Sequence, residues 1–286
     1  MLFCKQRYIF TRAERSLQPS VMDNNFRFRQ KHVLVTGAAS GIGLEIARQF
    51  AREGAMLSMF DNNEQQLSLV ANEFSGTTNA VFTYAVDVSN RLQVESAVAL
   101  AEAKQPIDIL INNAGIAIQT PFLNIEEAEW RKVLDVNLTG MFFVAQCVCR
   151  YMATKKSGVV VNMASKNGLD GEFGYAHYNA SKAGVIMLTK TMALELAHVG
   201  IRVNAVCPGY IQTPLSKAID SQEFTARFVE QFIPLNRPGL PEEIAPIFLF
   251  LAGNESSFIT GQVIIADGGQ LAGQKAGNDM LSITLQ

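Results

Sequence analysis

The side chains best suited to chemistry in this sequence lie in one stretch, residues 165–184. It contains Tyr178 and Lys182, four residues apart, and Ser165, thirteen residues before the tyrosine. From Tyr178 onward, apolar residues recur without an intervening proline, which predicts a helix. Because side chains at positions i and i+4 of a helix share one face, we expect Lys182 to lie beside Tyr178.

This adjacency would allow proton transfer. A free tyrosine has a pKa of about 10, which is too high for a base at neutral pH. A neighbouring ammonium group favours the phenolate, so Lys182 is predicted to lower the pKa of Tyr178. Such a tyrosine could take a proton from an alcohol or give one to a carbonyl oxygen. Alone, however, the spacing also fits a surface lysine stacked on a half-buried tyrosine.

A glycine-rich turn stands near the start of the chain. Residues 31–36 are an apolar strand-like run, and the sequence GAASGIG follows from Gly37 to Gly43 before a helical pattern over 42–52. Such a turn lets backbone N–H groups approach a phosphate, and the helix N-terminus adds positive potential. A flexible strand–helix connection is the alternative.

An acidic residue follows the next strand at the distance expected for a dinucleotide site. Asp61 directly follows the apolar run 55–60 and lies eighteen residues after Gly43. A carboxylate here binds the hydroxyls of an adenosine ribose and repels a 2′-phosphate, so we expect NAD rather than NADP. Asn62 and Asn63 offer no cation for such a phosphate. The alternative is a plain turn aspartate.

These residues are set in a regular alternation of strands and helices. Apolar runs predict strands at 31–36, 55–60, 80–86, 106–111, 158–164, 201–206 and 262–266. Helices are predicted at 42–52, 63–74, 90–103, 126–153, from Tyr178 onward and at 241–251, with a short helical excursion within 215–235. The pattern predicts an α/β fold: one doubly wound, seven-stranded, mostly parallel sheet with helices on both faces.

The composition excludes several other classes of protein. The chain of 286 residues is 48% hydrophobic and 17% charged with a net charge of −2, so it can bury a large core and shows no basic stripe for nucleic acid. None of the four cysteines has metal-ligand spacing, so no metal is expected. There is no run of eighteen apolar residues, and no membrane span is expected.

We expect residues 1–30 to be an N-terminal extension, 31–271 a single domain and 272–286 a C-terminal tail.

Together, the motifs resemble the short-chain dehydrogenase/reductase family. They occur in the family's order: TGAASGIG, NNAG, Asn137 within DVNLTG, Ser165, YNASK and PG. The resemblance covers about residues 31–271 and implies a Rossmann-type fold and hydride transfer between NAD(P) and a CH–OH or C=O group. The leader and the tail after residue 272 depart from the family pattern.

The resemblance also implies roles for individual residues. Tyr178 would be the general acid/base, Lys182 would tune its pKa and bind the nicotinamide ribose, Ser165 would bind the substrate oxygen, and Asn137 would hold a water linked to Lys182. Substrate contacts are implied for Ser165, Asn167 and Tyr178. Cofactor contacts are implied for Gly37, Ser40, Gly41, Ile42, Gly43, Asp61, Asp87, Val88, Asn113, Ala114, Gly115, Tyr178, Lys182, Pro208, Gly209, Ile211 and Thr213.

The substrate stays open at this point. The stretch 166–177 carries many polar groups beside the expected pocket, which suits a sugar or polyol, although several of them could point to solvent. A 3-oxoacyl carrier-protein reductase using NADPH is the alternative enzyme, and a non-catalytic nucleotide-binding scaffold is the alternative from another class. We expect His177 to pack rather than act as a base. The resemblance implies a homotetramer, and we expect a cytoplasmic protein.

Overall fold

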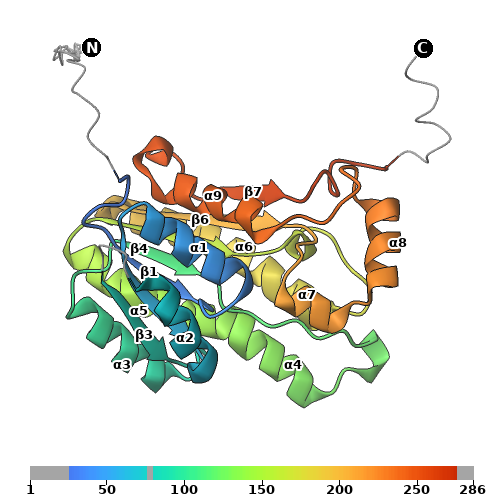
Figure 1. Cartoon of the computed structure of the whole chain (residues 1–286), viewed down its shortest axis with the longest axis horizontal. Coiled ribbons are helices and arrows are strands. Elements are labelled where there is room, and N and C mark those ends of the chain that lie inside the picture. Colours follow the sequence, from blue (N-terminus) through green and yellow to red (C-terminus); the bar gives the residue numbers. More distant parts are fainter. Residues whose placement is uncertain (1–25, 76–79, 276–286) are drawn as a thin grey trace, which may run out of the picture.

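The seven predicted strands form one sheet in which every pair of neighbours is parallel. The computed structural model describes residues 26–75 and 80–275 (Figure 1). The strands are β1 His32–Thr36, β2 Met56–Asp61, β3 Val81–Ala85, β4 Ile109–Asn112, β5 Gly158–Met163, β6 Ile201–Pro208 and β7 Val263–Ala266. Their order in the sheet is β3-β2-β1-β4-β5-β6-β7, which confirms the predicted doubly wound α/β fold.

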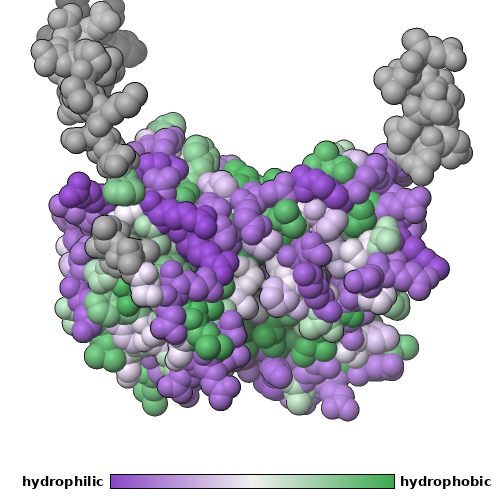
Figure 2. Space-filling model, viewed as in Figure 1, coloured by the Kyte–Doolittle hydropathy of each residue, from purple (hydrophilic) through white to green (hydrophobic). Residues whose placement is uncertain are grey.

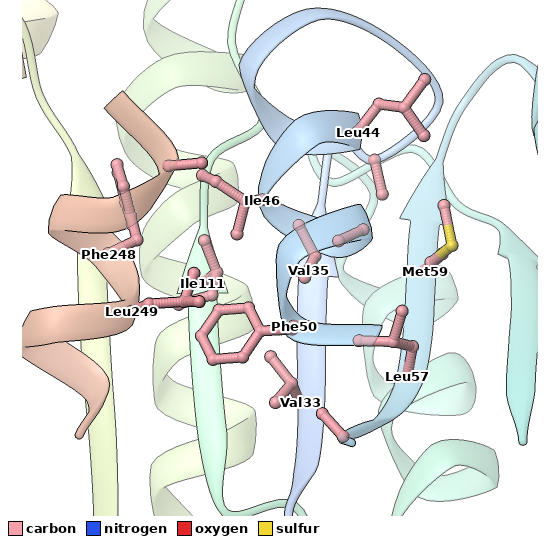
Figure 3. Packing of buried hydrophobic residues seen from close by; sticks show 14 of the residues in the cluster. Val33, Val35, Leu44, Ile46, Phe50, Leu57, Met59, Ile111, Phe248 and Leu249 are labelled. Carbon is pink, nitrogen blue, oxygen red and sulfur yellow. The ribbon is translucent and has the colours of Figure 1, made fainter. Parts of the chain in front are cut away.

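Helices cover both faces of the sheet because its strands are apolar on both sides. The helices α1 Gly41–Arg52, α2 Glu64–Ala71 and α9 Pro241–Ala252 share one hydrophobic cluster, in which Phe50 packs with Val33 and Phe248 (Figure 3). The helices α3 Arg91–Glu102, α5 Met141–Thr154 and α6 Ala176–Leu196 contribute to the opposite cluster, which includes Leu34. Successive residues of β1 thus point to opposite faces, as a strand requires.

The helix predicted over 126–153 is interrupted by a wide turn. It consists of α4 Glu127–Leu134, a π-helical segment Asp135–Gly140 and α5 Met141–Thr154. By length and composition the whole rod, Glu127–Thr154, could cross a membrane. Its inner side, however, is buried against the sheet through Val144, Val148 and Met152, as in a core helix. Two other bounds also differ from prediction, because α6 begins at Ala176 and the excursion within 215–235 forms two helices, α7 Pro214–Ile219 and α8 Gln222–Phe232.

The folded domain begins earlier than the boundary placed at residue 31. Phe28 is buried, and its ring centroid lies 4.7 Å from that of Phe50 in α1. Residues 26–30 are therefore attached to the folded domain through Phe28, whereas 1–25, and Cys4 with them, lie outside the described residues. At the other end, Lys275 Nζ donates to the backbone oxygens of Val229 and Glu230, while 276–286 lie outside the described residues.

The outer surface mixes apolar and polar side chains. On the face shown in Figure 2, hydrophobic residues form small patches among hydrophilic ones. On α5 and α6, Val148 and Ile186 are buried within the chain, whereas Leu194 is 83% exposed. The expected homotetramer interface on these helices thus has an exposed apolar residue available, and the oligomeric state remains a prediction.

Candidate active site

One cavity of about 630 Å³ lies where the carboxyl ends of the strands meet α1. Its wall contains every residue implied for the cofactor and the substrate by the sequence, from Gly37 to Thr213. Of the residues implied for catalysis, Ser165, Tyr178 and Lys182 line it, and Asn137 lies outside the lining. The strands β1 and β4 are neighbours in the sheet although they lie far apart in sequence. The cavity therefore opens at the point where the strand order reverses direction, which is where ligands bind in open α/β sheets.

The glycine-rich turn forms one end of the cavity. Gly37 and Gly41 have φ angles of +63° and +55°, a conformation that favours glycine. A side chain on Gly43 would place its Cβ 2.1 Å from the carbonyl oxygen of Gly37, so the turn closes tightly on the helix. No side chain of the described residues caps the first turn of α1 at Ser40. Its backbone N–H groups therefore remain available to an anion such as a diphosphate.

The turn is held in shape by Thr36 and Asn113. Asn113 Nδ2 donates to the carbonyl oxygens of Thr36 at 2.9 Å and Gly37 at 3.1 Å. In return, Thr36 Oγ1 accepts from the backbone N–H groups of Asn113 and Ala114 at 2.9 and 3.0 Å. Asn113 thus braces the cofactor-side loop in addition to lining the cavity. The role of Thr36 was not assigned from sequence, although a hydroxyl at a strand end before a glycine turn is a usable signal.

Asp61 lies at the end of β2 with its carboxylate fixed by the backbone. One carboxylate oxygen accepts from the N–H of Ala39 at 2.9 Å, and the other accepts from the N–H of Asn63 at 3.0 Å. The residue lines the same cavity as Asp87 and Val88. A negative charge is therefore held firmly where the second strand meets the glycine-rich turn.

Ser165, Tyr178 and Lys182 meet at the other end of the cavity. Ser165 follows β5 and is buried, and its Oγ accepts from the backbone N–H of Asn167 at 3.2 Å. Tyr178 and Lys182 lie on the first turns of α6, and Lys182 Nζ is 5.6 Å from the centre of the Tyr178 ring. Lys182 Nζ also donates to the carbonyl oxygen of Met163 at 2.9 Å. The predicted adjacency of the two side chains is therefore present.

The pKa of Tyr178, however, moves in the direction opposite to the one predicted. Burial raises the pKa of Tyr178 to about 12, and a hydrogen bond with Ser165 acts in the opposite sense. Burial also lowers the pKa of Lys182 to about 8. The helical spacing brings the ammonium near, but the loss of solvent around the phenol has the largest influence on its pKa. At neutral pH the phenol is thus held protonated.

Asn137 acts as a brace behind the cavity. Its side chain is fully buried in the π-helical segment, where its Oδ1 accepts from the N–H of Ile116 at 2.8 Å. Its Nδ2 donates to the carbonyl oxygen of Ile116 at 2.9 Å and to Ser181 Oγ at 3.2 Å. A Cβ on Gly115 would lie 3.2 Å from Asn137 Oδ1 and 3.4 Å from Lys182 Nζ, so the amide is close to the lysine.

The wall also contains residues that the sequence did not single out. These are chiefly large side chains from α6, β6, α7 and α8, namely Tyr175, Tyr210, Leu215, Ile219, Asp220 and Phe228, together with Lys132 of α4. Tyr210 donates its hydroxyl hydrogen to Asp220 Oδ2 at 3.0 Å. The path of α7 and α8 decides which side chains of this part of the chain reach the cavity.

His177 packs as predicted and does not reach the cavity. Its side chain is fully buried, and its Nε2 lies 2.9 Å from Glu129 Oε1 on α4. The histidine next to Tyr178 in sequence therefore fixes α6 against α4 rather than serving as a second base.

Comparison with known proteins assigns the class. A family model described as enoyl-(acyl carrier protein) reductase matches residues 37–270. The chain is 43% identical over 244 residues to 3-oxoacyl-(acyl-carrier-protein) reductase of Thermotoga maritima, a match that covers 85% of this chain and 98% of that protein. The chain belongs to the short-chain dehydrogenase/reductase family, and it is an NAD(P)-dependent oxidoreductase acting on CH–OH or C=O groups.

Solved structures agree in fold. A short-chain type dehydrogenase/reductase from Mycobacterium marinum superposes with a TM-score of 0.82 at 35% identity, covering 87% of this chain and 99% of that one. A gluconate 5-dehydrogenase from Burkholderia cenocepacia, in complex with NADP and tartrate, gives a TM-score of 0.82 at 35% identity, with 87% and 98% coverage. The scaffold alternative is set aside because the chain is an enzyme of this class.

Proposed function

We propose that this enzyme exchanges a hydride between NAD(H) and a small polyhydroxylated alcohol or its ketone. The observation that carries the proposal is the shared cavity, which has the glycine-rich turn and Asp61 at one end and Ser165, Tyr178 and Lys182 at the other. The first group fits a dinucleotide, and the second fits proton exchange with an oxygen. The nicotinamide, when bound, supplies or accepts the hydride.

Several features of the wall fit the dinucleotide. The uncapped first turn of α1 and the backbone of Gly37 to Gly43 would hold its diphosphate. Asp61 would accept hydrogen bonds from the adenosine ribose, and its charge would repel a 2′-phosphate. The NAD preference is assigned from this carboxylate, although the similar gluconate 5-dehydrogenase was solved with NADP. Lys182 would bind the ribose at the nicotinamide end, between Tyr178 and the Met163 carbonyl.

Tyr178 would exchange the proton with the substrate oxygen. Because burial keeps the pKa of Tyr178 at about 12, its phenol is protonated at neutral pH and is suited to donate a proton to a carbonyl oxygen. Ser165 would steady the charge that develops on the same oxygen. In the reverse direction the phenolate would take the alcohol proton, so oxidation is expected to accelerate toward alkaline pH.

The test combines a substrate panel with a variant of Tyr178. Reduced-cofactor absorbance is followed with NAD⁺ or NADP⁺ and a set of sugars, polyols and secondary alcohols. We expect turnover with NAD⁺ on a polyol and a loss of about 10²–10⁴-fold in kcat for Tyr178→Phe, with the Kd for NADH unchanged. The matched control is Tyr151→Phe on α5, outside the cavity. Wild-type turnover by Tyr178→Phe would refute the role of this phenol, and turnover with NADP⁺ alone would refute the assignment of Asp61.

A 3-oxoacyl reductase is the second candidate because one specific feature favours it. Phe224, Phe228 and Phe232 form a ladder along α8, with ring centroids 5.8 and 5.1 Å apart, and Phe228 lines the cavity. Such a ladder could pack against an acyl chain. This candidate predicts that NADPH reduces acetoacetyl-CoA faster than NADH reduces any ketose. Measuring both reductions beside the oxidation panel decides between the two functions.

A further inference from the structure

An ion pair lies in the wall of the cavity next to the proposed proton-transfer residues. Lys166 Nζ is 2.8 Å from Glu172 Oε2, and the two side chains are 6% and 24% exposed. Both residues line the same cavity as Ser165 and Tyr178. Lys166 directly follows Ser165 in the chain, and the Glu172 charge is close enough to act against ionisation of Tyr178.

Local structure does not depend on this ion pair. The backbone around Lys166 is fixed by the Asn167 N–H on Ser165 Oγ and by the Leu169 N–H on the Lys166 carbonyl oxygen, at 3.2 and 2.9 Å. The carbonyl oxygen of Glu172 accepts from Asn179 Nδ2 at 3.0 Å. Moving two charges out of water is costly, and apolar residues in the same place are often equally stabilising. A contribution to stability therefore does not by itself explain why the pair lies in the cavity wall.

The two side chains together match the hydrogen-bonding capacity of a hydroxyl group. An ammonium has three N–H donors and a carboxylate has two acceptor oxygens, and their mutual contact uses one of each. A hydroxyl both accepts and donates, so it could accept from Lys166 and donate to Glu172 at once. A keto oxygen only accepts, and a methylene group does neither.

We propose that the Lys166–Glu172 pair binds a second hydroxyl of the substrate, close to the carbon that reacts, and so selects uncharged vicinal polyols and hydroxyketones. The inference rests on the proposed function. Charge supports the exclusion of anions, because Glu172 neutralises Lys166. The two other lysines of the wall, Lys132 and Lys182, are outnumbered by the carboxylates of Asp61, Asp87 and Asp220. A sugar acid or a phosphorylated sugar would thus meet an unfavourable potential.

The decisive measurement compares substrates that differ by one hydroxyl. We would determine kcat/KM with NAD⁺ for 2,3-butanediol and for 2-butanol, and for sorbitol and gluconate. Sites built to bind a hydroxyl reject the analogue lacking it by about 10⁴-fold or more. Here Lys166 and Glu172 can still hydrogen-bond to each other when the hydroxyl is missing, so we expect a smaller preference for the diol, about 10²-fold. Sorbitol should likewise exceed gluconate.

Variants then link this preference to the pair. Lys166→Met/Glu172→Gln leaves no unpaired charge, and it should reduce the diol preference to within about tenfold, mainly through KM. Glu172→Gln alone is the second variant if the double variant is poorly folded. Asp170→Asn, an exposed neighbour outside the cavity wall, is the matched control and should keep the wild-type ratio. The Kd for NADH should be unchanged in all three.

The possible failures are distinguishable. Equal use of diol and mono-alcohol by the wild type, a diol preference that survives the double variant, or faster turnover of gluconate than of sorbitol would each overturn the inference while leaving an NAD-linked dehydrogenase in place. If NAD⁺ supports turnover of neither diol nor polyol, the proposed function falls and this inference falls with it.

Discussion

Lys182 should make the stability of this enzyme depend on pH in an unusual direction. Burial lowers the pKa of Lys182 from 10.5 to about 8. Below pH 8 the lysine is charged in both the folded and the unfolded states, and the folded state bears the cost of the buried charge. Between about pH 8 and 10.5 the unfolded chain binds the extra proton, so the free energy of unfolding should rise with pH.

The size of this effect follows from the same pKa. A difference between 10.5 and about 8 corresponds to a total of about 3 kcal/mol, of which about 2 kcal/mol should appear between pH 7.5 and 9.5. One neighbouring group acts in the opposite direction. Burial raises the pKa of Cys207 from 9.0 to about 11, so this thiol ionises first in the unfolded chain and opposes the lysine effect within the window; the lysine effect is therefore measured against a variant that lacks Lys182 but keeps Cys207.

The assay is urea unfolding of wild type and Lys182→Met at pH 7.5 and 9.5, followed by the fluorescence of Trp130, the single tryptophan. The difference between the two proteins removes the pH dependence of the groups that do not interact with Lys182. We expect wild type to gain about 2 kcal/mol relative to the variant. Lys190→Met, an exposed lysine on the same helix, is the control. An unchanged difference, or a gain by the variant, would refute the reasoning.

Two further predictions concern the parts that shape the cavity. Gly43→Ala should abolish NADH binding, measured by fluorescence titration, because its Cβ would lie 2.1 Å from the Gly37 carbonyl oxygen. The control is Gly171→Ala, whose added Cβ would meet nothing within 4 Å, and wild-type NADH affinity in Gly43→Ala would contradict the prediction. Asn137→Ala should lower the free energy of unfolding, measured by urea titration, by about 2–4 kcal/mol, because it leaves the backbone N–H and C=O of Ile116 without their partner. A loss below about 1 kcal/mol would show that these two backbone groups find other partners.

The sequence predicted the features that depend on local pattern. Apolar runs located all seven strands, and the glycine spacing located the turn that Gly37 and Gly41 form with positive φ angles. The i, i+4 spacing placed Lys182 near Tyr178 correctly. Each of these results follows from residues close together in the chain, whose geometry is set by the helix or strand that contains them.

The features that were missed depend on residues far apart in the chain. The pKa of Tyr178 is set mainly by burial, and then by Ser165, Glu172 and Cys207, which arrive from other elements. The water expected at Asn137 stays a prediction, but the hydrogen bonds of Asn137 to Ile116, a partner twenty-one residues away, could not be predicted from a local pattern. Likewise, Tyr210 and Phe228 enter the wall only because β6, α7 and α8 follow a path that no local pattern specifies.

The π-helical segment implies a restriction on chain length. A π turn holds an extra residue, and each residue of a regular α-helix turns the chain by about 100°. The π turn therefore absorbs one residue without changing how α4 and α5 are oriented, whereas adding or removing a residue within α4 or α5 would rotate one helix relative to the other by about 100°. Either Glu129 would leave His177 or Val144 and Val148 would leave the sheet. We therefore expect the α-helical parts on either side of this segment to tolerate changes of residue more readily than an insertion or deletion.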